Sequence, residues 1–204
     1  MKKTALLIVF LLFISPCIAA HVPYFEHRDF TETKPYYVWK NVEQSKAFYA
    51  WLETGEDIDV YSFKVNSQSI RVYAELIVPV IDDIYEEFVP WFALVGPGLP
   101  EYNESLPFEI PGGYGIIVME NVAPGENRTT FYEFFGGKSY YEGPVLDINV
   151  SEEGTYYIVC WDPYKTGGDY VFVLGKKEIF GPFDILRALI YTPLIRRNKE
   201  LHLP

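Results

Sequence analysis

Short apolar segments with a two-residue period recur along this chain, and turns rich in Gly and Pro separate them. In residues 70–78 an apolar side chain at every second position alternates with Arg71, Tyr73 and Glu75. This period is typical of an antiparallel strand that is buried on one face. Nine such segments are expected, at 36–40, 46–52, 58–65, 70–78, 91–96, 115–119, 145–150, 155–161 and 170–174. They predict an all-β fold, an antiparallel β-sandwich or jelly roll of eight to nine strands.

Aromatic content supports the same fold class. The chain contains 15 Phe, 17 Tyr and 4 Trp, residue types that favour half-buried strands. Two regions depart from the strand pattern. Between residues 96 and 143 Pro, Gly and aromatic residues accumulate, which predicts long loops at one end of the sandwich, where binding sites usually lie. From Gly181 and Pro182 to about Pro193 the pattern predicts a short C-terminal helix.

The first twenty residues have the features of a secretory signal. Lys2 and Lys3 precede an apolar run, and small residues lead to a cleavage site after Ala20. The protein is therefore expected to be secreted or extracytoplasmic and to begin at His21. Two alternatives stay open: an uncleaved segment that acts as a membrane anchor, and a lipoprotein modified at Cys17. Cys160, the other cysteine, is expected to be a buried, inert thiol.

We therefore divide the chain into a signal peptide (1–20), an N-terminal arm (21–35), one β-sandwich domain (36–175) and a basic amphipathic tail (176–204). The net charge of −11 makes nucleic acid and anionic lipid headgroups poor partners for most of the surface, and no nucleic acid partner is expected. The tail reverses this sign, with six basic against three acidic residues. Its apolar stripe consists of Ile185, Leu186, Leu189 and Ile190.

Two roles for this tail remain open. The stripe packs on the protein's own sandwich, or the helix lies on a membrane or partner surface with contacts from Arg187, Arg196 and Arg197. Asp184 and Arg187 argue against a helix that spans the membrane.

Two groups of strands resemble a known family. Residues 57–65 (Asp-Ile-Asp-Val-Tyr-Ser-Phe-Lys-Val) and 154–159 (Gly-Thr-Tyr-Tyr-Ile-Val), with 168–173 (Gly-Asp-Tyr-Val-Phe-Val), resemble the hallmark strands of bacterial pre-peptidase C-terminal domains and similar secreted jelly rolls. Residues 79–144 show no match. The resemblance implies a noncatalytic module that binds polymers or surfaces. Because some relatives hold calcium, it also implies Asp57 and Asp59 as candidate Ca²⁺ ligands; the alternative is a solvated acidic surface.

Other site chemistry has weaker support in the sequence. An N-terminal His21 resembles the copper-binding histidine of secreted oxidases, but such a site needs a second imidazole, and only His27 and His202 are present. No nucleophile motif, zinc pattern or phosphate loop occurs, and no acidic pair is singled out for glycoside hydrolysis. We assign no catalytic residue and no certain cofactor. Acceptor sequons for N-glycosylation occur at Asn103, Asn127 and Asn149.

These observations favour a noncatalytic, secreted or envelope-associated module that binds a surface polymer, a protein partner or a membrane surface. An enzyme that uses copper or acts on carbohydrate is the first alternative, and exposed aromatic residues such as Trp91 and Tyr102 are candidates to stack on sugar rings. A structural subunit of an envelope complex is the second alternative.

Overall fold

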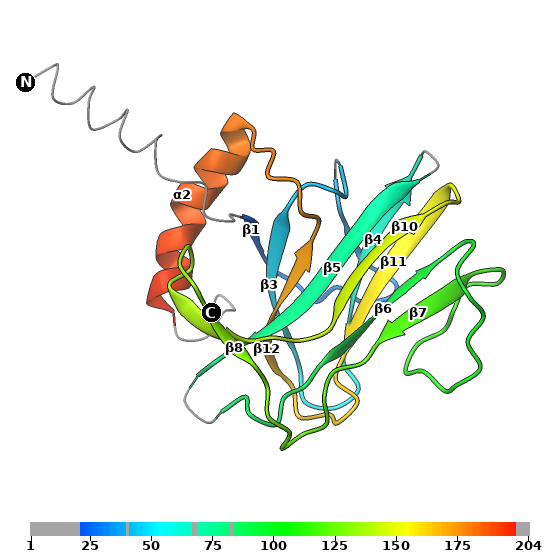
Figure 1. Cartoon of the computed structure of the whole chain (residues 1–204), viewed down its shortest axis with the longest axis horizontal. Helices are drawn as coiled ribbons and strands as arrows, with labels where there is room; N and C mark the ends of the chain where they lie inside the picture. Colours follow the sequence, from blue (N-terminus) through cyan, green and yellow to red (C-terminus); the bar gives the residue numbers. More distant parts are fainter. Residues whose placement is uncertain (1–20, 40, 67–68, 82–83, 199–204) are drawn as a thin grey trace, which may run out of the picture.

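Two β-sheets packed face to face form a β-sandwich, and one long helix lies against it (Figure 1). The computed structural model describes residues 21–39, 41–66, 69–81 and 84–198. The predicted signal segment and His202 lie outside this part of the chain. The elements are β1 (Val22–Phe25), β2 (Tyr36–Tyr37), β3 (Lys46–Leu52), β4 (Ile58–Val65), β5 (Ile70–Pro79), β6 (Trp91–Gly96), β7 (Gly115–Met119), β8 (Thr130–Glu133), β9 (Lys138–Tyr141), β10 (Val145–Val150), β11 (Gly154–Trp161), β12 (Gly168–Leu174) and α2 (Pro182–Arg197).

The larger sheet has seven strands in the order β1-β3-β12-β5-β9-β8, with β10 also paired to β5. Strands β9 and β10 follow one another along β5, with Tyr141 opposite Val78 and Val145 opposite Glu75. Between these two pairs the β9–β10 side has one residue more than β5, and this extra residue forms a bulge. Gly143 suits this bulge, since a Cβ atom there would lie 2.2 Å from the backbone oxygen of Leu76.

The smaller sheet has the order β2-β4-β11-β6-β7. All strand pairs of both sheets are antiparallel except two at sheet edges, where β1 runs parallel to β3 and β2 runs parallel to β4. Both exceptions come from the N-terminal arm and the residues just after it. The arm thus adds one edge strand to each sheet.

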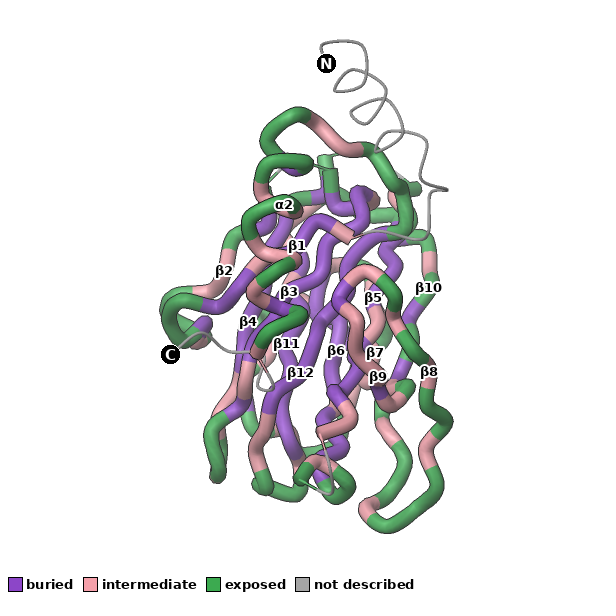
Figure 2. Tube along the Cα trace, turned by 90° about the vertical axis from the view of Figure 1, so that its left-hand side faces the viewer, coloured by how far each residue is buried: buried purple, intermediate pink, exposed green. Residues whose placement is uncertain are grey.

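The core lies between the two sheets and is rich in aromatic side chains. Tyr61, Phe92 and Phe172 are fully buried there, and the ring centroids of Tyr61 and Phe172 lie 4.8 Å apart. Cys160 is also fully buried, as expected, and burial raises the pKa of its thiol well above the ordinary value. Figure 2 shows that the buried residues follow the central strands.

Each sheet also carries an apolar cluster on its outer face. On the seven-stranded sheet this cluster includes Tyr49, Val171 and Ile195, so α2 contributes to its cover. On the five-stranded sheet it includes Val159 and Phe108, so the loop between β6 and β7 covers that face. The sandwich is therefore covered on both outer sides.

The all-β fold, the sandwich and the short C-terminal helix are confirmed, with differences in detail. All nine predicted segments contain a strand, and three further strands, β1, β8 and β9, bring the number within the described residues to twelve. The helix does not end near Pro193, because this proline is accommodated within it and the helix continues to Arg197.

Candidate binding surface on helix α2

The start of α2 is fixed to the sandwich by a buried acidic residue. Pro182 occupies the first turn, where its missing amide hydrogen costs no hydrogen bond. The Asp184 Oδ2 atom accepts hydrogen bonds from the Gly181 amide at 2.9 Å and from the Gln44 side chain at 3.0 Å. Gln44 lies two residues before the start of β3. This contact therefore links the start of the helix to the seven-stranded sheet.

One face of α2 packs on β1. The Arg187 guanidinium lies over the Tyr24 ring, 4.2 Å from its centroid, and Tyr191 meets Phe25 edge to face at 5.0 Å. One turn further, Ile195 is only 1% exposed. These residues recur every three to four positions, the period of a single helix face. The helix thus docks with the face that carries Asp184, Arg187, Tyr191 and Ile195.

The predicted apolar stripe lies on the other side. Ile185, Leu186, Leu189 and Ile190 are all exposed, and Phe183 and Leu189 reach 81% and 69% exposure. We define Phe183, Ile185, Leu186, Leu189 and Ile190 as the outer face of α2. Packing of this stripe on the sandwich, one of the two roles expected for the tail, is not observed: the helix docks by the opposite face and leaves the stripe exposed within the described residues.

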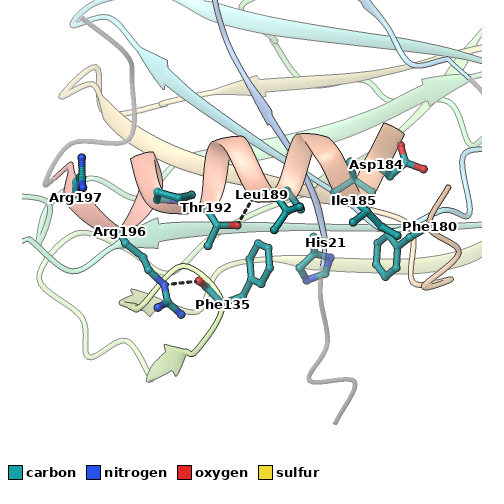
Figure 3. A pocket seen from close by; sticks show the side chains of 12 residues that line it. His21, Phe135, Phe180, Asp184, Ile185, Leu189, Thr192, Arg196 and Arg197 are labelled. Carbon is teal, nitrogen blue, oxygen red and sulfur yellow. Dashed lines mark hydrogen bonds between the residues drawn. The ribbon is translucent and has the colours of Figure 1, made fainter. Parts of the chain in front are cut away.

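A cavity of about 610 Å³ lies beside this outer face. Its lining comes from His21 and the start of β1, from α2 with the preceding Phe180, and from the β8–β9 turn. Figure 3 shows His21, Phe135, Ile185 and Leu189 facing a common space. Arg196 borders it and donates hydrogen bonds to the carbonyl oxygens of Phe134 and Phe135. The side chains around this space are mainly apolar.

The three predicted contact residues of the tail differ in environment. Arg196 and Arg197 are exposed at the C-terminal end of α2. Arg187 is half-buried against Tyr24 and therefore belongs to the docking face. Within the residues that the structure describes, no helix combines the length and hydropathy needed to cross a membrane.

The two predicted calcium ligands do not lie together. Asp57 is half-exposed, and its Oδ2 atom accepts a hydrogen bond from the Glu53 amide at 2.7 Å. Asp59 lies instead near Glu26 and Asp29, and one carboxylate oxygen of each lies within 4.8 Å of the others. Calcium binding stays a prediction. Sequence reasoning missed Glu26 because it comes from the arm, 33 positions before Asp59.

Glu26 and Asp59 form a buried carboxyl pair. They are 3% and 1% exposed. Asp59 accepts hydrogen bonds from the Tyr170 hydroxyl at 2.6 Å and the Phe30 amide at 3.4 Å, and Glu26 accepts one from the Trp51 amide at 3.2 Å. Burial raises the pKa of both groups, and the proximity of Asp59 raises that of Glu26 further. The pair therefore retains a proton at neutral pH.

His21, the candidate copper ligand, is half-buried, and its Nδ1 atom hydrogen-bonds with the Ser45 hydroxyl at 2.5 Å. Burial lowers the pKa of its ring. Strand β1 separates it from His27, which lies in the loop beyond the far end of this strand. A second imidazole for His21 would thus have to come from His202, outside the described residues. Copper binding at His21 stays a prediction.

The three glycosylation sequons all have exposed asparagines. Asn103 and Asn127 lie in loops, as expected, whereas Asn149 lies in β10 with its side chain exposed. Their modification stays a prediction.

The fold and this surface define an all-β sandwich module with a helix added to one outer face. No protein-family model matches the sequence, and a search of curated proteins finds no match. Among solved structures, the chain is similar to the pre-peptidase C-terminal domain of a collagenase from Bacillus anthracis. The two share 13% sequence identity over 74% of this chain and 98% of that domain, with a TM-score of 0.37. The family of this solved structure is the one that the strand motifs resemble.

Proposed function

We propose that this protein is a noncatalytic extracytoplasmic module that docks on an anionic membrane surface through the outer face of α2. The observation that carries the proposal is that α2 leaves its most apolar face uncovered, whereas the face with Asp184 and Arg187 docks on the sandwich. The apolar stripe of a surface helix normally faces a core. An exposed apolar area of this kind marks an interaction site.

Charge favours a lipid surface as the occupant. Asp184 is the single acidic residue between positions 182 and 197, and it lies on the docking face. The outer face therefore presents apolar side chains with Arg196 and Arg197 at one end and no carboxylate. A basic residue near an anionic membrane contributes about 1 kcal/mol. The strongly acidic remainder of the protein would turn away from the same surface.

The position of the N-terminus supports the same occupant. His21, the first residue after the predicted signal, borders the cavity beside α2. If residues 1–20 are retained as an anchor, the anchor joins the domain beside the outer face. If they are removed, the outer face still provides a peripheral contact. Both forms place the same side of the molecule against the membrane.

A vesicle sedimentation assay tests the proposal. The protein is purified from the extracytoplasmic fraction, its N-terminus is identified by intact mass, and it is mixed with phosphatidylcholine vesicles with or without phosphatidylglycerol. We expect sedimentation with the vesicles, stronger when phosphatidylglycerol is present. The double variant Leu186→Glu, Leu189→Glu should lose binding, since both residues are exposed and their substitution leaves the core intact.

Ile84→Glu with Val122→Glu is the matched control, because both residues are exposed apolar side chains that neither belong to α2 nor line the cavity beside it. This control should bind vesicles as the parent does. Failure of the parent to bind, or equal binding by the α2 variant, would contradict membrane docking.

A further inference from the structure

A second recess lies on the opposite side of the sandwich from α2. It has a volume of about 510 Å³ and is bordered by the β3–β4 turn, the loop between β6 and β7, and the turn after β11. Trp91 opens β6 and Trp161 closes β11, and the two residues are direct neighbours across these strands. Both belong to the apolar cluster on the outer face of the five-stranded sheet. We call this recess the aromatic cleft.

Aromatic rings line the cleft. Trp161 is buried between Trp91, at 6.1 Å, and Phe108, at 5.4 Å, both in edge-to-face contact. Trp91 and Tyr102 are half-buried, so part of each ring surface is accessible. Trp161 is thereby fixed by ring contacts on two sides, and its own packing in turn fixes the accessible ring of Trp91.

Negative charge surrounds these rings. The lining includes five carboxylates against one lysine. Lys165 forms a salt bridge with Glu56 at 2.6 Å. Asp162 accepts hydrogen bonds from the backbone amides of residues 164, 166 and 167, which lie in the turn that it begins. These two acids therefore have structural roles. Three further carboxylates lie on the lining: Asp57, which accepts the Glu53 amide; Glu104, which accepts the Tyr102 hydroxyl at 3.4 Å; and Glu120.

We propose that the aromatic cleft binds an organic cation, an ammonium group carried by a small amine or by a lysine side chain. The negative π-face of Trp or Tyr attracts a cation, and this attraction strengthens when water is partly excluded. The negative charges of the three carboxylates on the lining attract the same cation. An anionic ligand would be repelled, and a neutral ligand would gain nothing from the charge.

This site is independent of the membrane contact. The cleft and α2 lie over the outer faces of different sheets, and Figure 1 shows α2 and β7 on opposite sides of the molecule. A protein docked through α2 therefore leaves the cleft open to solvent. Loss of either activity leaves the other intact.

The test is an NMR titration of the purified protein that follows the indole N–H resonance of Trp91. This N–H is buried and lacks a hydrogen-bond acceptor within the described residues, so it reports local changes in its surroundings. The probes are choline, spermidine and the peptide acetyl-Gly-Lys-Gly-amide. We expect saturable shifts that weaken as salt is added. If the small amines bind and the peptide does not, the source is a free amine; the reverse result identifies a lysine side chain.

The double variant Glu104→Gln, Glu120→Gln removes two charges and keeps side-chain size. It should weaken binding by about three- to tenfold, the range expected for two partly exposed charge contacts. Glu126→Gln with Glu142→Gln is the control, since both residues are exposed and neither lines the cleft. Absence of saturable binding by every amine, equal binding by the cleft variant and the control, or binding of cellohexaose in place of the amines would overturn the proposal.

Discussion

Glu26 and Asp59 are the two residues whose chemistry depends most on the fold. Neither forms a salt bridge with a basic residue within the described part of the chain. Two adjacent buried carboxylates cannot both ionise without a large cost, so the folded protein keeps a proton between them. Glu26 extends β1, and Asp59 lies in β4. The protonated Glu26–Asp59 pair is thus a contact between the N-terminal arm and the five-stranded sheet.

This proton makes stability depend on pH. In the unfolded chain both carboxyl groups lose their protons near pH 4, whereas in the folded protein both pKa values are raised, that of Glu26 to about 10. Between these limits the folded state binds more protons than the unfolded state. The free energy of unfolding therefore falls as pH rises, by up to about 1.4 kcal/mol per pH unit for one proton.

Substitution of Glu26→Gln should remove most of this dependence, because the neutral amide still donates a hydrogen bond to Asp59 and does not titrate. We expect the variant to be more stable than the parent at pH 8–9 and to show a flatter curve. Denaturant unfolding at a series of pH values measures this. Parallel curves for parent and variant would show that Glu26 does not hold the proton.

Asn103 links glycosylation to the aromatic cleft, since the next two residues line it. In a host that glycosylates asparagine, intact mass should show glycans at Asn103 and Asn127. A glycan at Asn103 should weaken amine binding by obstructing the cleft, and enzymatic removal should restore it. The Asn103→Gln variant should bind equally with and without this treatment. A glycan at Asn127 alone should have no effect on binding.

At the scale of elements, α2 is held by a small number of contacts on one face. Ile195 is 1% exposed, whereas Ile190 is 55% exposed. Ile195→Ala should therefore destabilise the protein by about 2–4 kcal/mol, the cost of removing a buried apolar side chain. Ile190→Ala should change stability by less than about 1 kcal/mol. Thermal or denaturant unfolding measures both, and equal effects would contradict the observed orientation of the helix.

The strand with the clearest alternation was β5, because the apolar side chains at every second position, such as Val72 and Leu76, face the core between the sheets. Strand β1 has only four residues, one of them Pro23, and pairs at a sheet edge, so its pattern is weak. Strands β8 and β9 form a short outer hairpin of mixed burial. The orientation of α2 could not be read either, because the face that docks carries Asp184 and Arg187, whereas the more apolar stripe stays exposed.

The candidate sites were harder to predict from the sequence than the strands. The exposed stripe of α2 and the basic residues after it were identified from local spacing. The Glu26–Asp59 pair and the aromatic cleft depend on contacts between segments far apart in the chain. Trp91 and Tyr102 were recognised as candidates for stacking, but their convergence with Glu104 and Glu120 requires the strand order and the course of the β6–β7 loop.

The whole molecule combines an acidic sandwich with one helix surface that carries no acid. Its net charge is −11, and the basic residues of the tail lie beside the outer face of α2. Near an anionic membrane such a distribution favours one orientation, with α2 toward the lipid and the aromatic cleft away from it. Docking through α2 and binding of a cation in the cleft are thus compatible in one molecule.

Simultaneous binding is the prediction at this scale. Protein attached to phosphatidylglycerol vesicles should bind a fluorescent derivative of the most tightly bound amine probe with a Kd within about twofold of that of the free protein, since the two surfaces share no described residue. Fluorescence anisotropy with and without vesicles measures this, and vesicles with the probe alone correct for its own attraction to lipid. The Leu186→Glu, Leu189→Glu variant should bind the probe normally while it fails to bind vesicles. If the probe instead displaces the protein from vesicles, both ligands compete for one surface, and the arrangement of two separate sites is wrong.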